Sequence, residues 1–564
     1  MSRKLWQLFK PVPQDFIESF PEYSTITLQL LYNRGLCTEE EIEKFLNPDY
    51  ENDLYDPFLM KDMEQAVRRI KKAINQKEKI VIYGDYDVDG VTAVAILYKT
   101  LKALKAPYID YYIPDRNKEG YGLNKEAISQ LVEEKIDLII TVDCGITNYE
   151  EVELANKMGI ETIITDHHLV VSNLPSALAI LNPQRKDDRY PFKELAGVGV
   201  AFKLVQALLK TPDNHFEPFL KWMMDLVALG TIADNVPLLD ENRVFVKYGL
   251  IVLRKTKNLG LRALMAKAKV NPANLDTEEV NFQLAPRLNA ASRMDHAYTS
   301  LRLLVTSDYQ EAEEIAEDLN KFNNQRQKLI EKIYQQAKEQ IQKIKSKEKI
   351  LILAHPDWSA AVLGLVAGRL VDEFYRPVIL IEKGNQESKG AARSIENFNI
   401  TTALSKCSKL LIQFGGHKEA AGFSLETKNL ENFKEKMSKI ASSQIKDKDL
   451  ICSLKIEADI NPQDISWNFY EELERFRPFG IGNPSPLFRL KNVKVLESYK
   501  VGNAEKHLKL HFKNGDKEIK AIGFNLGKLM EGIKNKKKVD IVCGLKPNYW
   551  NGTCDLELEI FDLK

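Results

Sequence analysis

The sequence lacks several features that would place the protein in a specialised class. Its 564 residues include 80 Lys and Arg and 80 Asp and Glu, so the formal net charge is zero and bulk charge does not indicate a nucleic-acid partner. No uncharged apolar run approaches the roughly 18 residues of a membrane span, and the basic N-terminus lacks the apolar core of a signal peptide. We therefore expect a soluble, cytoplasmic protein with no membrane partner, whose affinity for nucleic acid, if any, comes from a local basic surface.

Cysteine is scarce, and its spacing excludes a zinc site of the usual kind. The chain has six cysteines, and no two of them form a C-x-x-C pair. They are Cys37, Cys144, Cys407, Cys452, Cys543 and Cys554. Scattered thiols in a large chain are typical of a reducing, cytosolic setting.

Short β-branched runs, each followed by a helix-like stretch, alternate between residues 79 and 183. The runs lie at 79–85, 108–116, 137–143, 161–168 and 178–183. Apolar strands that alternate with helices predict a parallel sheet covered on both faces. Because ligands of such sheets bind beyond the carboxyl ends of the strands, the polar residues that end these runs are expected to gather in one place.

The sequence after residue 183 predicts a helical region, a second α/β unit and a C-terminal barrel. Residues 195–345 have mostly helical patterns, and the charged amphipathic stretch 308–345 has no Pro or Gly, which predicts a long connecting helix. A second α/β unit begins at residue 349, and its glycine clusters at 389–394 and 414–423 are interpreted as turns.

A polar linker at 442–449 precedes the last part of the chain. Six short alternating segments follow it, and they predict a small OB-like β-barrel, a fold that often binds single strands. The expected class is therefore α/β, with a parallel-sheet domain, a long connecting helix, a second α/β domain and a C-terminal barrel.

The densest acidic cluster directly follows the first predicted strand. Asp85, Asp87 and Asp89 lie within five residues, and an extended chain would place all three on one side. Carboxylates this close raise one another's pKa values, a conflict that a divalent cation removes, and such ligands suit manganese or magnesium. Gly90 is expected to let the backbone turn into a helix that starts near Val91. A solvated acidic turn or a calcium loop is the alternative.

Other strand ends carry further candidate ligands. Asp143 ends the third run, Asp166, His167 and His168 end the fourth, and Asp234 follows an apolar helix. A lone His at a strand end is usually structural, but two adjacent His after an Asp at a third acidic strand end are less easily explained in that way. An Asp can fix the tautomer of a ligating His. Together these groups are sufficient for a two-metal centre.

These motifs resemble a known family. GDYDVDG, TVDCGIT, DHH and GTIADNVPL match, in order, the four motifs of the DHH phosphoesterases, and APRLNAASRM, GGHKEAAGF and RPFGIGNPSPLF match the set typical of the RecJ exonucleases in that family. The resemblance implies these parts: an N-terminal helical segment (1–50), a DHH domain with a helical extension (51–305), a connecting helix (306–345), a DHH-associated α/β domain (346–445) and an OB-like nucleic-acid-binding domain (450–564).

The resemblance also implies a hydrolase that degrades single-stranded DNA from 5′ to 3′ into 5′-mononucleotides by a two-metal mechanism. Its setting would be DNA repair and recombination, with a helicase and a single-strand-binding protein as partners. The cofactors would be two ions, Mn²⁺ or Mg²⁺, which activate water and neutralise the phosphoryl oxygens.

A specific ligand set follows from the same resemblance. The implied metal ligands are Asp87, Asp89, Asp143, His167 and Asp234, with Asp85 adjacent. Relatives with another form of the first motif have a His where this chain has Tyr83, so Asp85 is expected to compensate. His168 would contact the scissile phosphate, and Asp166 would orient the two histidines. No Ser or Cys nucleophile is required, and Cys144 is expected to be structural.

Substrate contacts are expected from arginine-rich and glycine-rich segments, because Arg forks fit phosphate and glycine lets backbone N–H groups approach an anion. The candidates are Arg116, Arg287, Asn289, Arg293, Asn323, Arg326, Arg393, Ser394, Gly416 and His417. Relatives use such groups to hold the 5′ phosphate, whereas a single Arg elsewhere is usually only surface charge. Tyr121, Tyr549 and Trp550 could stack on bases or belong to the core.

The chain departs from the family pattern near these candidates. The family's Trp-His pair and the following Gly are replaced here by Trp358, Ser359 and Ala361, and a Ser is replaced by Ala391. These changes remove one imidazole and one hydroxyl from the expected phosphate contacts.

Two other functions stay open at this point. One is a DHH hydrolase of nano-RNA, cyclic dinucleotides or polyphosphate, although a small substrate needs no C-terminal barrel. The other is a non-catalytic DNA-binding scaffold, although all the core acids and both histidines are present.

Overall fold

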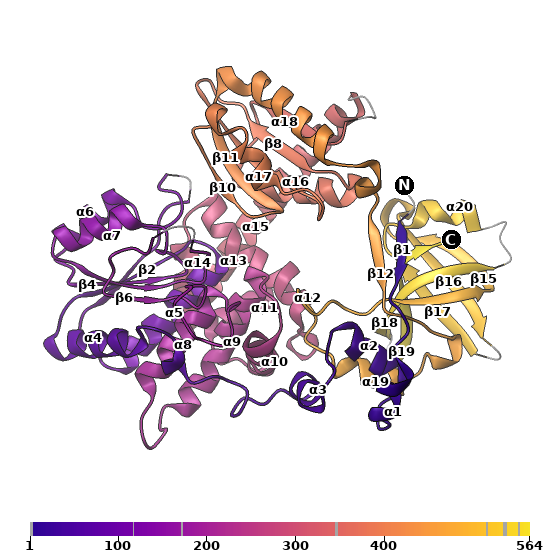
Figure 1. Ribbon diagram of the computed structural model, residues 1–564, viewed down its shortest axis with the longest axis horizontal. Coiled ribbons are helices and arrows are strands. Elements are labelled where there is room, and N and C mark those ends of the chain that lie inside the picture. Colours follow the sequence, from indigo (N-terminus) through magenta and orange to yellow (C-terminus); the bar gives the residue numbers. More distant parts are fainter. Residues whose placement is uncertain are drawn as a thin grey trace. The chain divides into compact units, whose positions relative to one another are not determined.

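The computed structural model describes residues 4–116, 118–170, 173–343, 348–514, 517–533, 538–550 and 553–564, without the side chains of Asn514, Lys517, Tyr549, Trp550 and Thr553. The chain forms two compact units (Figure 1). The first comprises Met1–Leu54, Pro237–Lys247 and Ser453–Lys564, and the second comprises Tyr55–Val236 and Tyr248–Cys452. In the ranges described, no helix is both long and apolar enough to cross a membrane.

The second unit contains a five-stranded sheet in which all neighbouring strands are parallel. In spatial order the strands are β3 (Ile109–Tyr112), β2 (Ile80–Gly84), β4 (Leu138–Val142), β5 (Glu161–Thr165) and β6 (Ala179–Leu181). Every residue of β2 and β4 is buried, because helices cover both faces. Figure 1 shows α6 (Lys125–Glu133) and α7 (Tyr149–Lys157) on one face, and α4 (Met63–Gln76), α5 (Val88–Ala103) and α8 (Gly197–Leu209) on the other. The parallel α/β fold predicted from the sequence is confirmed.

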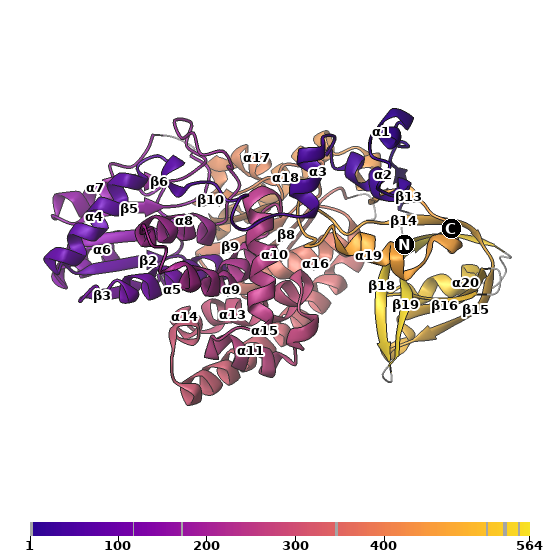
Figure 2. The same ribbon diagram turned by 90° about the horizontal axis from the view of Figure 1, so that it is seen from below.

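Helices make up most of the second unit between its two sheets. The helix α9 (Glu217–Asp234) packs against α5 and α8 (Figure 2). A π-helical turn at Val280–Leu284 leads into α13 (Ala285–Met294). The predicted connecting helix is α15 (Tyr309–Lys343), a continuous helix of 35 residues that packs against α13 and α16 (Ala360–Phe374).

The second sheet of this unit is mixed. Its order is β10 (Gln413–Gly416), β11 (Ala420–Glu426), β9 (Glu387–Arg393), β8 (Val378–Glu382) and β7 (Leu351–His355), and the pair β7 and β8 is parallel. The interpretation of the first glycine cluster as a turn is wrong, since it lies in β9, which pairs with β11 in antiparallel fashion. The second cluster does contain a bend, at 417–419, but its glycines lie in the antiparallel strands β10 and β11 on either side of it. Glycine is needed there for close packing: a Cβ at Gly390 would lie 2.2 Å from the ring of Phe423.

The first unit is built on a seven-stranded sheet. Its order is β13 (Ala458–Asp459), β14 (Phe488–Val493), β18 (Val539–Trp550), β19 (Thr553–Leu563), β17 (Lys517–Gly523), β16 (His507–Asn514) and β15 (Val495–Val501). The N-terminal segment has the expected helices, α1 (Gln14–Ser19), α2 (Thr25–Asn33) and α3 (Glu39–Leu46). It also opens with a strand that the sequence did not indicate, β1 (Leu5–Leu8), which pairs in parallel with β12 (Ser453–Ile456). So short a strand is stabilised by its distant partner and not by its own sequence.

A buried arginine fixes one loop of the first unit. Arg243, on α10 (Asp240–Arg254), is 2% exposed and has no carboxylate partner in the described part of the chain. Its guanidinium donates to the carbonyls of Phe45 (2.7 Å), Phe476 (3.1 Å) and Arg477 (2.8 Å), and it lies 3.9 Å from the centre of the Phe45 ring. One side chain therefore joins α3, α10 and the segment after α19 (Trp467–Glu474).

Replacing this guanidinium is expected to destabilise the first unit. Arg243→Met leaves several buried carbonyl groups without a donor, so we expect the free energy of unfolding to fall by about 3 kcal/mol. Urea denaturation followed by circular dichroism measures the change. The matched control is Arg68→Met on α4, where the side chain is exposed and a change within about 0.5 kcal/mol is expected. Equal stability of the two variants would contradict the role assigned to Arg243.

Candidate metal centre

The first acidic motif bends around the start of a helix. The helix α5 begins at Val88, so the expected extended chain and the expected helix start near Val91 are both wrong. Asp87 is the N-cap residue, and its carboxylate accepts a hydrogen bond from the N–H of Gly90 (3.1 Å). A Cβ at Gly90 would lie 2.6 Å from the carbonyl oxygen of Asp85, so glycine is required here because the two backbone segments are in close contact.

Asp89 is held by the N-terminus of a second helix. Its two carboxylate oxygens accept hydrogen bonds from the N–H groups of Gly197 (2.6 Å) and Val198 (2.8 Å), at the start of α8. The positive end of a helix stabilises a carboxylate in this position. A Cβ at Gly197 would also lie 2.5 Å from Oδ1 of Asp143. Neither Gly197 nor Val198 was predicted as a site residue, and the one indication of them in the sequence was the Gly-Val-Gly run at 197–199.

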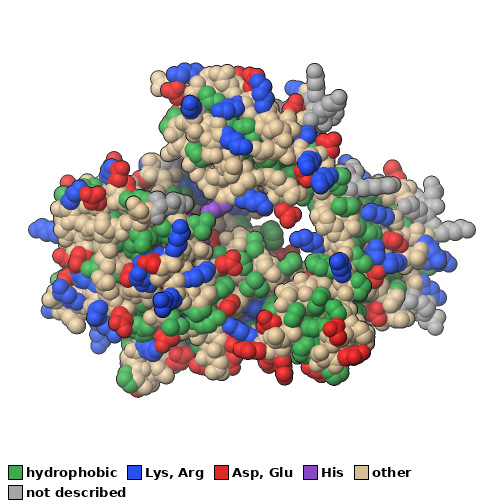
Figure 3. Space-filling view, in the orientation of Figure 1, with side chains coloured by type: hydrophobic (Ala, Val, Ile, Leu, Met, Phe, Trp, Pro, Cys, Tyr) green, Lys and Arg blue, Asp and Glu red, His purple; other side chains and the backbone are tan. Residues whose placement is uncertain are grey.

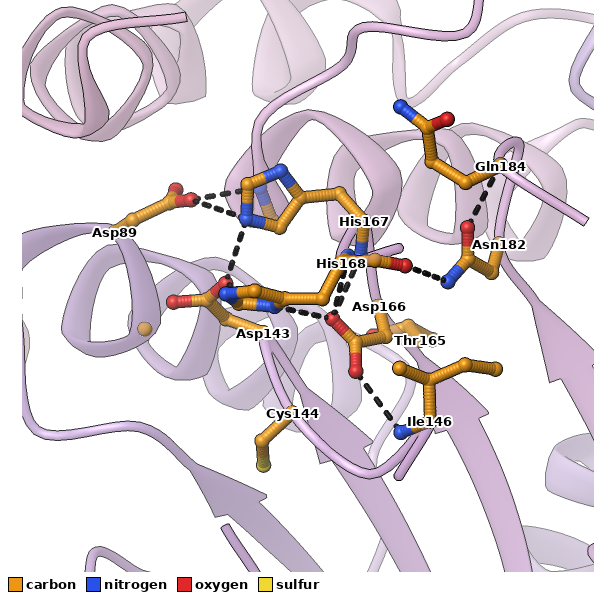
Figure 4. Close-up of polar contacts among 12 residues, drawn as sticks. Asp89, Asp143, Cys144, Ile146, Thr165, Asp166, His167, His168, Asn182 and Gln184 are labelled. Atoms are coloured by element: carbon orange, nitrogen blue, oxygen red, sulfur yellow. Dashed lines mark hydrogen bonds and ion pairs between the residues drawn. The ribbon is translucent and has the colours of Figure 1, made fainter. Parts of the chain in front are cut away.

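His167 lies among carboxylates from three separate parts of the chain (Figure 4). Its Nε2 atom is 3.1 Å from Oδ1 of Asp143, 3.7 Å from Oδ2 of Asp234 and 3.9 Å from Oδ2 of Asp89. Asp143 follows β4, His167 follows β5, and Asp234 ends α9. The carboxyl ends of β4 and β5 thus bring Asp143 and His167 together, as the sequence predicted for polar residues at that edge, and the end of α9 adds Asp234.

Asp166 orients the two histidines that follow it. Its Oδ1 accepts from the backbone N–H of His167 (2.7 Å) and of His168 (3.0 Å), and it lies 2.8 Å from Nδ1 of His168. Its Oδ2 accepts from the N–H of Ile146 (2.9 Å). The hydroxyl of Tyr121 lies 3.0 Å from the same Nδ1 and donates to the carbonyl of Asp143 (3.0 Å). Tyr121 is therefore part of this hydrogen-bonded group and not an isolated stacking surface.

The Asp166–His168 pair carries opposite charges. Burial by itself would raise the pKa of Asp166, but the hydrogen bond and charge of His168, the charge of His167 and the N–H of Ile146 together outweigh it and lower that pKa. Burial likewise opposes protonation of His168, yet Asp166 raises the pKa of His168 to about 9. The pair is therefore an aspartate and an imidazolium at neutral pH.

The remaining carboxylates are buried without enough positive charge. Burial and the nearby Asp87 raise the pKa of Asp85, and burial and Asp234 raise the pKa of Asp89 to about 7. Burial and Asp89 raise the pKa of Asp143. Oδ1 of Asp85 and Oδ1 of Asp143 are buried and have no hydrogen-bond partner. Such oxygens fit a bound cation, which would supply the missing positive charge.

Three overlapping sets of side chains have ligand atoms within 4.8 Å of one another. They are Asp85, Asp87 and Asp143; Asp89, His167 and Asp234; and Asp143, His167 and His168. The sets contain all six residues that were predicted as metal ligands, and their hard oxygen and imidazole donors suit Mn²⁺ or Mg²⁺.

Tyr83 and Cys144, which neighbour the metal centre, have structural roles. Tyr83, at the position where some relatives have His, is buried, and its hydroxyl donates to the carbonyl of Gly122 (3.1 Å) while its ring stacks on Tyr112. Asp85 occupies the cluster instead. Cys144 is buried with its thiol toward the carbonyl of Tyr83, and burial raises the pKa of that thiol, which makes it a poor nucleophile.

Several predicted substrate contacts form a group that we call the arginine cluster: Arg116, Arg287, Arg293, Arg326 and Arg393. None of the five forms an ion pair in the described residues, and the Nε atoms of Arg293 and Arg326 are buried without a partner. Burial, with repulsion from Arg116 and other members, lowers the pKa of Arg293 to about 9. Figure 3 shows charges of both signs mixed over the visible face of the molecule. Within the cluster Arg326 is buried and the other four arginines are half-buried. Its unpaired N–H groups suit an anion such as phosphate.

The other predicted contacts lie in the same unit and differ in what they do. Asn323 is buried and accepts from Arg326 (2.8 Å), and Oδ1 of Asn289 is buried without a partner. The hydroxyl of Ser394 donates to the carbonyl of Phe398 (2.6 Å) and so fixes the chain after β9.

Gly416 and His417 end β10. Gly416 has φ of +138°, and a Cβ there would lie 2.3 Å from the carbonyl oxygen of Ala420. His417 is exposed. Burial raises the pKa of Asp234, and the nearby His417 is one of the groups that lower it in part. The second sheet thus contributes a histidine to the surroundings of the metal centre.

Comparisons with known proteins match the chain along most of its length. The DHH family, N-terminal domain, matches residues 79–231, the DHHA1 domain matches residues 347–443, and the RecJ OB domain matches residues 456–562. The single-stranded-DNA-specific exonuclease RecJ of Bacillus subtilis is 40% identical over 569 residues, which cover 100% of this chain and 71% of the relative. RecJ of Escherichia coli is 31% identical over 559 residues, 96% of each chain.

A solved structure shows the same architecture. The crystal structure of RecJ from Thermus thermophilus in complex with Mn²⁺ has a TM-score of 0.84 and 30% identity, and the match covers 100% of this chain and 80% of that one. A second crystal structure from the same organism contains Mg²⁺.

The contact between Gly197 and the acidic cluster predicts a sensitive position. The Gly197→Ala substitution would place a methyl group against Asp143, and it would also disturb the N–H group that donates to Asp89. Because both carboxylates are predicted metal ligands, we expect the affinity for Mn²⁺ to fall by about 10-fold or more. Isothermal titration calorimetry measures it. Gly368→Ala on α16 is the matched control, because a Cβ at Gly368 has no atom within 4 Å. Unchanged affinity in Gly197→Ala would show that this contact relaxes without effect.

Proposed function

The chain belongs to the RecJ family of DHH phosphoesterases, and on that premise we propose that it hydrolyses single-stranded DNA from the 5′ end and releases 5′-mononucleotides. The observation that supports this most directly is the convergence of five carboxylates and His167 on one edge of a parallel sheet, where the buried Oδ1 of Asp85 has no hydrogen-bond partner. Such a cluster is a metal-dependent hydrolytic centre and not a structural acidic turn.

The divalent ions would be held by the six side chains of the metal centre. They are Asp85, Asp87, Asp89, Asp143, His167 and Asp234. When bound, two ions supply an activated water and neutralise the phosphoryl oxygens. The N–H groups at the start of α8 orient Asp89 and favour its ionised form, and so oppose the rise in its pKa that burial causes.

In this proposal, His168 contacts the scissile phosphate. Its Nδ1 atom faces Asp166, which fixes the ring and keeps it protonated. The other ring nitrogen, Nε2, is then a charged donor for a non-bridging phosphate oxygen. Asp166 acts as a positioning residue, because it holds both histidines through their backbone N–H groups.

The arginine cluster is proposed to hold the 5′ phosphate and the adjoining backbone. Arg293 donates to the carbonyl of Ala361, one of the positions where the chain departs from the family pattern. Arg393 lies against Gly364 on α16, where a Cβ would come within 3.2 Å of the guanidinium. The N–H groups that remain unpaired provide the phosphate contacts, together with Asn289, Asn323, Ser394, Gly416 and His417.

The wider role in this proposal is DNA repair and recombination. A helicase that supplies single strands and a single-strand-binding protein are included as partners, and they rest on the family resemblance alone. The 5′-to-3′ direction rests on the same resemblance.

Hydrolysis of end-labelled strands tests the activity. With Mn²⁺, a 5′-labelled oligonucleotide is expected to release labelled mononucleotide at once, while a 3′-labelled one shortens progressively, and a chelator is expected to stop both. His167→Ala should reduce hydrolysis to the level of the chelated enzyme, because it removes a ligand shared by two of the three sets. Lys269→Glu, an exposed position, serves as the control. Hydrolysis of a cyclic dinucleotide in place of the strand would contradict the proposal.

The role of the arginine cluster has its own test. Arg393→Gln is expected to raise KM for a 5′-phosphorylated strand by about 10-fold or more, which corresponds to the loss of one charge-assisted hydrogen bond. The effect on a 5′-hydroxyl strand should be smaller. Arg369→Gln is the matched control, since that arginine is exposed and pairs with Glu331. Equal effects on the two strands would place the 5′ phosphate elsewhere.

A further inference from the structure

A second cationic site lies in the second unit, apart from the metal centre. It is a pocket of about 410 Å³ at the end of α10 and along α11 (Leu259–Ala268). These elements carry no residue of the metal centre and none of the arginine cluster. The pocket is therefore a separate place on the molecule.

Four cationic side chains line this pocket: Arg254, Lys255, Lys257 and Arg262. All four are exposed, and in the part of the chain that the structure describes none of them forms an ion pair. No acidic residue lines the pocket. The chain has as many acidic as basic residues, so four unpaired cations around one cavity are not a consequence of its overall charge. Their mutual repulsion favours a bound anion.

The cations are anchored by their surroundings. The Nε atom of Arg254 donates to the carbonyl of Leu275 (3.0 Å), which leaves its terminal nitrogens free of hydrogen bonds within the described residues. The ammonium of Lys257 lies 4.1 Å from the centre of the Trp222 ring. Both side chains are thus held without using the donors that would face a ligand.

The floor of the pocket is rigid. Thr256 is 6% exposed and its hydroxyl donates to the buried carboxylate of Asp225 on α9. The same hydroxyl accepts from the N–H of Asn258 (3.0 Å), and Asn258 caps α11 by accepting from Leu261 (3.1 Å). Since the helix end is already capped, the attraction for an anion comes from the four side chains and not from the helix.

We infer that this pocket binds a phosphate group outside the catalytic centre, and that the phosphate belongs to the nucleic-acid strand. Two guanidinium forks and two ammonium groups match the several oxygens of a phosphate. The volume is in the range of about 300–1,000 Å³ that holds a small ligand, and so fits a phosphate with its attached sugar. A free mononucleotide presents the same chemistry and is the other source. The choice of the strand rests on the proposed function.

Binding measurements in the presence of chelator separate these sources without hydrolysis. The probes are a long polythymidylate and thymidine 5′-monophosphate. Lys257→Glu/Arg262→Glu is compared with Lys269→Glu, which reverses the charge of an exposed lysine that does not line the pocket. If the strand occupies the pocket, the slope of log affinity against log salt should fall by about 0.7 for each phosphate that the variant no longer neutralises. A fall in monophosphate affinity that accompanies this change in slope also supports the pocket as a site for a strand phosphate.

The two probes give distinguishable results. If the variant loses affinity for the monophosphate while the salt dependence of polythymidylate binding is unchanged, the pocket is a phosphate site, but its ligand is the free nucleotide. If neither probe is affected, or if the control variant shows the same loss, the site is refuted. The neutral pair Lys257→Gln/Arg262→Gln repeats the test if the charge reversal disturbs folding, as judged by circular dichroism. Hydrolysis by the wild-type enzyme with Mn²⁺ is measured in parallel, so a failure of the proposed function is seen separately.

Discussion

Buried negative charge is the constraint around which the second unit is organised. Asp85, Asp89 and Asp143 lie where water cannot solvate them and where each repels the next. Taking one such charge out of water is costly unless it is paired. The chain offsets only part of that cost with its own groups, and the remaining unpaired oxygens make a cation necessary for the ionised form.

The groups that offset the cost come from backbone as much as from side chains. The start of α8 donates two N–H groups to Asp89, and the segment after β5 donates two to Asp166. These donors cannot move without moving a helix or a strand, so they fix the carboxylates more firmly than flexible side chains could. The close approach at Gly197 follows from the same arrangement, because the helix end must reach the cluster.

The arginine cluster complements the acidic cluster. Arg293 and Arg326 keep unpaired donors, while the carboxylates keep unpaired acceptors. No ion pair joins the two groups in the described residues, so each retains its capacity for a ligand of opposite charge. A cation and a phosphate satisfy both requirements together, which is the physical basis of metal-dependent phosphodiester hydrolysis.

The parallel α/β fold, the long helix and the acidic and histidine motifs could all be predicted from the amino-acid sequence, because apolar periodicity and residue type are local properties. Prediction failed where the reason was a distant contact. The strand character of Gly390 and Gly416 depends on pairing with β11, and that of β1 depends on β12, far along the chain. The start of α5 at Val88 and the donation from Gly197 to Asp89 depend on how helices meet at one edge of the sheet. Only the tertiary structure could decide these, since it brings together backbone groups whose positions no single stretch of sequence encodes.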